Sequence, residues 1–164
     1  MTATYEKIAT TTLGSSSATV DFTSISGSYT DLILIINCTT ASGGDDLYIR
    51  VNSDTGSNYS LTQMSGDGSS TSSTRRTNFS RFMADNSYPS TTEGFNQIVH
   101  FINYSNTTTY KTFLSRANRA NHTTGTTVGL WRSTSAITSI NLLLAGALSF
   151  ASGSTFTIYG IKAE

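Results

Sequence analysis

Residues 32–36, Leu-Ile-Leu-Ile-Ile, constrain the fold of this chain more than any other stretch. The run is mostly β-branched and stands between polar neighbours, and it is too short for an ordinary helix. Such a run is typical of a strand that is buried on both faces. A turn signal precedes it at 25–28, and a polar loop with two glycines follows at 39–46. We therefore expect residues 32–36 to form the central strand of a sandwich.

The next segment, 47–52, alternates strictly, with Leu47, Ile49 and Val51 on one face. We expect it to lie beside the central strand. Further short strands are predicted at 5–12, 18–22, 59–64, 75–83, 97–104, 110–119, 126–132, 136–145 and 155–162. No segment shows sustained helical periodicity with caps at both ends. A helix competes only at 142–150, where Gly146 weighs against it.

About ten or eleven short strands separated by turn signals predict an all-β chain. We expect one domain, residues 1–164, folded as a jelly-roll-like antiparallel β-sandwich, which leaves few open edges. Residues 1–14 are either an N-terminal arm or the first strand. Residues 65–74 and 85–94 are rich in turn formers and are expected to be two exposed loops, the first being the more mobile.

Charged residues make up 12% of the chain, and ten basic residues balance ten acidic ones. Ordinary soluble domains carry about 25%. With no net charge there is no general attraction for nucleic acid or anionic membrane, and no run approaches the roughly 20 apolar residues of a membrane helix. Serine and threonine form about a third of the chain and supply its polar surface. Disorder is a poor alternative, because the 37% hydrophobic residues fall into strand-like groups.

Four segments, SISGSYTDLILII (24–36), DDLYIRVNSDTGSNYS (45–60), AITSINLLL (136–144) and STFTIYGIKAE (154–164), follow one another along the chain. In these residues the sequence resembles a family of small virion structural proteins of tailed bacteriophages. The resemblance extends over nearly the whole chain and contains no catalytic motif. Members of that family occur as free-standing particle proteins and as modules near fibre ends, so the resemblance implies a virion protein without giving its position.

The resemblance implies two alternative roles. As a capsid decoration (cement) protein, the chain would form a homotrimer that stabilises the shell by contacts with the major capsid protein or other virion proteins. As a tail-fibre or receptor-binding module, it would bind a host surface glycan through loops and aromatic rings. The chain contains no coiled-coil or repeat shaft, which favours decoration. The N-terminus lacks a signal-peptide pattern, so we expect a virion assembled in the host cytoplasm.

Catalytic motifs are missing from the sequence. His100 lies in an apolar strand and His122 in a loop, and neither has a carboxylate close by in sequence to orient it. Glu6, Glu93 and Glu164 are far apart, so a glycosidase pair has no support from spacing. We expect no enzymatic activity, no cofactor and no metal site. A polysaccharide depolymerase is the rival hypothesis.

The single cysteine and the loop aspartates have structural interpretations. Cys38 follows the central strand and is expected to be a buried, inert thiol. The aspartates Asp45, Asp46, Asp54 and Asp67 fall near glycines, where carboxylates could hold calcium. Their spacing matches no known calcium loop, so turn formation is the better explanation.

Two groups of residues are candidates for an interface. Arg75, Arg76 and Arg81 form a local cluster of cations interleaved with phenylalanines. They either dock on an acidic partner surface or protect a solvated edge strand. Trp131 and Arg132 form the second group, in which the tryptophan is either an interface anchor or a core residue.

Overall fold

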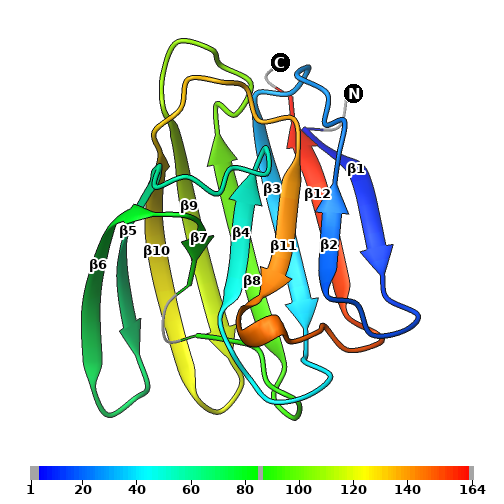
Figure 1. Ribbon diagram of the computed structural model, residues 1–164, viewed down its shortest axis with the longest axis vertical. Helices are drawn as coiled ribbons and strands as arrows, with labels where there is room; N and C mark the ends of the chain where they lie inside the picture. Colours follow the sequence, from blue (N-terminus) through cyan, green and yellow to red (C-terminus); the bar gives the residue numbers. More distant parts are fainter. Residues whose placement is uncertain (1–3, 85–86, 163–164) are drawn as a thin grey trace.

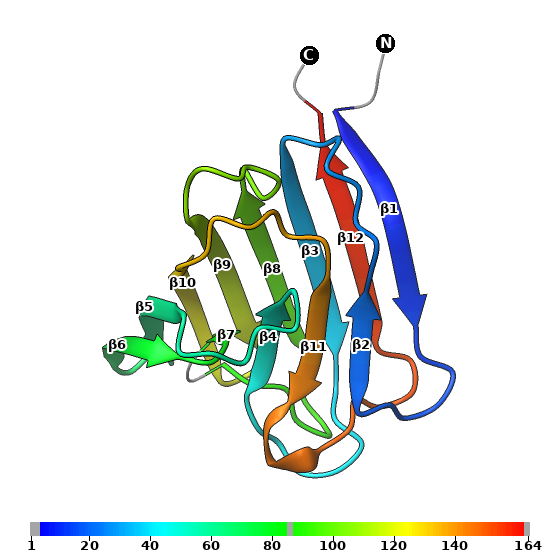
Figure 2. The same cartoon turned by 45° about the horizontal axis from the view of Figure 1, so that its top comes forward.

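The computed structural model describes residues 4–84 and 87–162, which form twelve β-strands and one short 3₁₀ helix (Figure 1). Two antiparallel sheets pack face to face as a sandwich, and the turned view shows them as two layers (Figure 2). The prediction of a single all-β sandwich is confirmed, and the order of the strands is compatible with a jelly roll. The described residues contain no helix long and apolar enough to cross a membrane.

The large sheet has eight strands, which are all paired antiparallel. In spatial order they are β1 (Tyr5–Thr12), β12 (Thr155–Ile161), β3 (Asp31–Cys38), β8 (Phe95–Ile102), β9 (Lys111–Arg119), β10 (Thr123–Trp131), β5 (Tyr59–Gly66) and β6 (Thr71–Phe79). The first segment is therefore a strand and not an arm. It forms one edge of the sheet, where Lys162 at the other end of the chain makes an ion pair with Glu6 at 2.6 Å.

The small sheet consists of β2 (Thr19–Phe22), β11 (Ile140–Leu144), β4 (Leu47–Val51) and β7 (Phe82–Met83). It lies in front of the large sheet in Figure 1, and the β5–β6 hairpin extends beyond it. The expectation that segment 47–52 lies beside the central strand is wrong, because β4 pairs with β11 and β7 in the opposite sheet. Its alternation is as predicted: Leu47, Ile49 and Val51 face the core.

The apolar run is part of β3, a central strand of the large sheet. Leu32, Leu34 and Ile36 have no exposed surface and pack toward the small sheet. Ile33 and Ile35 point the other way and are half-buried. Burial on both faces was therefore an overestimate, because no second layer of strands lies over this side of the described sheet.

Aromatic rings fill the core between the sheets. Phe113 of β9 makes edge-to-face contacts with Phe82 of β7 at 5.3 Å and with Phe101 of β8 at 5.0 Å. Phe82 therefore joins the small sheet to the large one. Such pairs add stabilisation beyond the apolar area that they bury.

Residues 65–74 do not form the expected loop. They contribute the end of β5, a short turn and the start of β6. The Asp67 carboxylate accepts hydrogen bonds from the backbone N–H groups of Ser69 and Ser70, which closes the turn. The serines and threonines on both sides have backbones that pair in the sheet, so a composition typical of loops here forms a hairpin.

In segment 142–150, the helical alternative is realised only as the 3₁₀ helix Ala145–Ala147.

Candidate interaction surface

Trp131 is a core residue, so its interpretation as an exposed anchor is wrong. Only 3% of it is exposed, and its ring stacks on Tyr59 at 6.5 Å. Its Nε1 donates a hydrogen bond of 2.6 Å to Oδ2 of Asp54. Burial alone would raise the pKa of Asp54, but hydrogen bonds from Trp131, Asn58 and Gly56 hold this pKa below its usual value.

Arg81 also has a structural position. Its guanidinium lies 3.9 Å from the ring centroid of Tyr48 and 4.3 Å from that of Phe79. Arg76 stacks on the same Phe79 ring at 5.4 Å. Arg81 therefore contributes cation–π contacts inside the molecule, and it is not available as a docking cation.

The remaining candidates lie on different parts of the surface. Arg132 is held by its Nη2, which donates to the Ser57 carbonyl at 2.6 Å and to Oδ1 of Asn78 at 3.0 Å. Neighbouring residues of a strand point to opposite faces, so Arg75 points away from the small sheet and Arg76 toward it. The arginine cluster of the sequence thus does not form one surface, and Arg75 is the member that is exposed.

The face of the large sheet that points away from the small sheet is called here the outer face. Along β5, β9 and β10, outward residues alternate with buried ones. Three outward residues are large, apolar and exposed, with exposed fractions of 64% for Met64, 54% for Val128 and 46% for Leu114. We call these three residues the apolar belt. On β9 the side chain of Phe113 points into the core, and that of its neighbour Leu114 points outward.

The register of the strands places the three residues of the apolar belt near one another, with Met64 diagonal to Val128 because it pairs with Thr126. Leu114 lies opposite Val128 across the β9–β10 pair, and on its other side it lies opposite His100 of β8. One row further, Met64 and Ile98 are separated by Thr126 and Arg116. The half-buried Ile33 and Ile35 of β3 continue both rows toward the middle of the sheet.

Shallow hollows mark the outer face. One of about 460 Å³ is lined by Arg75, Val128 and Leu130, and another of about 700 Å³ by Met64, Arg116 and Thr126. A third, of about 320 Å³, lies between Ile98 and Arg116. The apolar belt and the cations beside it therefore line hollows of the outer face, into which convex parts of a partner could fit.

His100 and Asp31 are hydrogen-bonded on the outer face, with 2.8 Å between Nε2 and Oδ2. The other oxygen of Asp31 accepts the Asn103 backbone N–H at 2.7 Å. Sequence reasoning missed this pair because 69 residues separate the partners. The cross-strand neighbours of His100 are Ile33 and Leu114, so no nucleophile lies directly opposite it.

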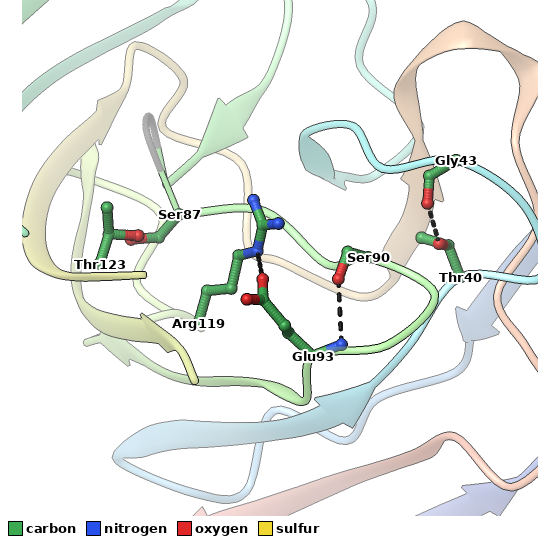
Figure 3. Close-up of polar contacts among 7 residues, drawn as sticks. All are labelled: Thr40, Gly43, Ser87, Ser90, Glu93, Arg119 and Thr123. Atoms are coloured by element: carbon green, nitrogen blue, oxygen red, sulfur yellow. Dashed lines mark hydrogen bonds and ion pairs between the residues drawn. The ribbon is translucent and has the colours of Figure 1, made fainter. Parts of the chain in front are cut away.

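A polar cluster joins the loop that leads from β7 to β8 to the end of β9 and the start of β10 (Figure 3). Arg119 at the end of β9 makes an ion pair with Glu93 and stacks on the ring of Tyr88 at 4.7 Å. The Ser87 and Thr123 hydroxyls are hydrogen-bonded at 2.9 Å. These contacts hold the described part of the loop, residues 87–94, on the sheet. The charged and hydroxyl groups of the cluster therefore have a structural role.

A separate hollow of about 300 Å³ lies between this loop and the β5–β6 hairpin. Tyr88, His122, Asp67 and several hydroxyl groups line it. His122 is exposed. The ring of Tyr88 lies 6.4 Å from that of His122.

Other chemical candidates have structural roles. Cys38 is buried, as predicted, and burial raises the pKa of its thiol. The carboxylates of Asp54 and Asp67 organise their turns, as expected for turn formers. Within 4–84 and 87–162, no three His, Cys, Asp or Glu side chains gather as a metal site would require.

A scan against models of protein families finds no match to the sequence. A search of curated proteins finds no match either.

Proposed function

We propose that this protein is a structural, non-enzymatic component of a tailed-bacteriophage virion. Its most favoured role is capsid decoration, in which a homotrimer stabilises the shell through contacts with the major capsid protein or other virion proteins. The sequence resemblance supports the virion assignment. The proposed location is the virion, assembled in the host cytoplasm, without nucleic acid or membrane as partners.

The observation that carries the proposal is the outer face of the large sheet. Its apolar belt of Met64, Leu114 and Val128 is exposed on neighbouring paired strands of the large sheet. Exposed apolar side chains that gather on one face are typical of a protein–protein interaction site. Such a face supports a role in which binding to other proteins is the activity.

The chemistry of the described residues supports a protein without catalysis. The Cys38 thiol is buried, and its raised pKa keeps it protonated at neutral pH. The His100–Asp31 pair lies beside aliphatic residues, while Glu93 is held by Arg119. These groups therefore do not form an acid, base and nucleophile set.

One observation favours the alternative, a tail-fibre or receptor-binding module that recognises a host glycan. The hollow beside Tyr88 and His122 combines rings with hydroxyl groups and the Asp67 carboxylate. Sugars are bound by such combinations, through stacking and hydrogen bonds. The guanidinium of Arg119 already covers one face of the Tyr88 ring, which leaves less of it for a sugar.

Counting copies of the protein per particle tests the proposal. Quantitative mass spectrometry of purified virions, with the major capsid protein as the internal standard, gives this number. Decoration requires hundreds of copies, whereas a tail or fibre position gives a few or a few dozen. A count in the lower range would reject decoration, and absence from the virion would reject the proposal as a whole.

A further inference from the structure

We infer that the outer face of the large sheet is the docking surface, and that its partner is a different protein that presents an apolar patch bordered by carboxylates. The inference rests on the proposed function and deepens it by naming the surface and the chemistry of the partner. Four observations carry it: the area of the face, its apolar belt, its hollows and its uncompensated positive charge.

The outer face is large enough for a stable interface. Eight strands of about eight residues, with about 4.8 Å between strands and about 3.3 Å per residue, give a face of roughly 900 Å². An interface of standard size buries about 800 Å² on each partner. The partner can therefore be held by this one face.

The centre of the face has the composition of an interface core. Leu114 and Val128 lie opposite each other in the middle of the β9–β10 pair, and Met64 lies on the adjoining strand. Around them stand threonine, serine and asparagine side chains. An apolar centre with a polar rim is the arrangement found at specific protein interfaces.

The charged residues of the outer face determine which charge a partner surface must carry. The outer face carries the cations Lys7, Arg75 and Arg116, and its carboxylate Asp31 is already bound by His100 and the Asn103 backbone. Among the described residues, neither Arg75 nor Arg116 forms an ion pair. Both arginines line hollows beside the apolar belt, where a carboxylate of a partner could reach them.

The same charges disfavour a second copy of this chain as the occupant. If two copies met through their outer faces, cations would oppose cations, and like charges that face each other across an interface disfavour binding. A surface rich in aspartate or glutamate around an apolar patch complements this face instead. In the proposed function, that surface belongs to the shell.

The test measures binding of the purified protein to particles of the encoding bacteriophage, assembled without this gene. Binding is followed by co-sedimentation over a range of protein concentrations. Two variants alter the face, Arg116→Glu and Val128→Asp. The control, Thr19→Glu, adds a charge at an exposed position of β2 in the small sheet. Circular dichroism and thermal unfolding show that each variant is folded before it is used.

We expect wild type and Thr19→Glu to bind alike, and each face variant to bind at least about tenfold more weakly. If wild type binds and the face variants bind equally well, the docking surface is wrong while the proposed function stands. If wild type does not bind, the proposed function fails. Sedimentation equilibrium tests the remaining alternative, a second copy of this chain on the outer face. If wild type forms oligomers and the face variants are monomers, the outer face binds a second copy and the inference is overturned.

Discussion

The indole of Trp131 and the carboxylate of Asp54 are joined by a hydrogen bond of 2.6 Å between residues that are 77 positions apart in the chain. The bond ties the end of β10 to the turn between β4 and β5. The same carboxylate accepts from the backbone N–H of Gly56 at 2.7 Å and from Nδ2 of Asn58 at 2.9 Å. One ionised side chain thus holds both the turn and the tryptophan.

Replacing Asp54 by Asn should lower the free energy of unfolding at pH 7 by about 1 kcal/mol, because the hydrogen bonds lose their ionised acceptor. The pKa of Asp54 is lowered in the folded state. Its stabilising effect is therefore complete above the unfolded pKa of about 3.9 and is lost as the pH falls through the folded pKa. Urea unfolding from pH 7 to pH 2 should show a smaller loss in Asp54→Asn than in wild type. Equal losses would contradict this role.

The close approach of Phe82 to Gly129 should make any side chain at position 129 costly. A Cβ there would lie 2.5 Å from the Phe82 ring, which packs in the core. Gly129→Ala should therefore destabilise the protein by about 1–3 kcal/mol, because the ring and the small sheet must shift. Gly14→Ala is the matched control, since a Cβ at Gly14 would meet nothing within 4 Å. Thermal unfolding of both variants measures the difference in stability, and similar midpoints for Gly129→Ala and Gly14→Ala would refute the close packing.

Arg81 and Arg75 should differ in their effects on stability, although both belong to the arginine cluster of the sequence. Arg81→Ala removes the contacts with Tyr48 and Phe79 and should cost about 1–2 kcal/mol. Arg75→Ala, at an exposed position, should change stability by less than about 0.5 kcal/mol. Urea titrations of the two variants measure both values. A larger loss for Arg75→Ala would reverse the assignment of structural and surface roles.

The Cys38 thiol should be unreactive in the folded protein. It is buried, and its raised pKa leaves almost no thiolate at pH 7.5. We expect a thiol reagent to label it only as fast as the protein unfolds, so the labelled fraction should follow the urea unfolding curve. Cys38→Ser, which has no thiol, controls for background labelling. Rapid labelling without denaturant would show that the thiol is accessible.

Local patterns were sufficient for the fold class. Alternation in 47–51 predicted which side chains of β4 face the core, and the apolar run at 32–36 predicted a central strand. These predictions succeeded because a strand has a period of two residues, so burial on one face is visible in the sequence. The hairpin at 59–79 was divided wrongly, because serine and threonine are compatible with both strands and loops.

What the sequence by itself determined is the all-β class, most of the strands and the residues that those strands can bury. The tertiary structure alone decided which sheet each strand joins and which face of the large sheet stays uncovered. Leu114 and Phe113 are neighbours of similar hydrophobicity, yet one is exposed and the other buried. Trp131 is a core residue because Asp54 and Tyr59 meet it from distant segments. Such outcomes depend on pairing between segments that are far apart in the chain, and the local sequence pattern does not show which distant segments will meet.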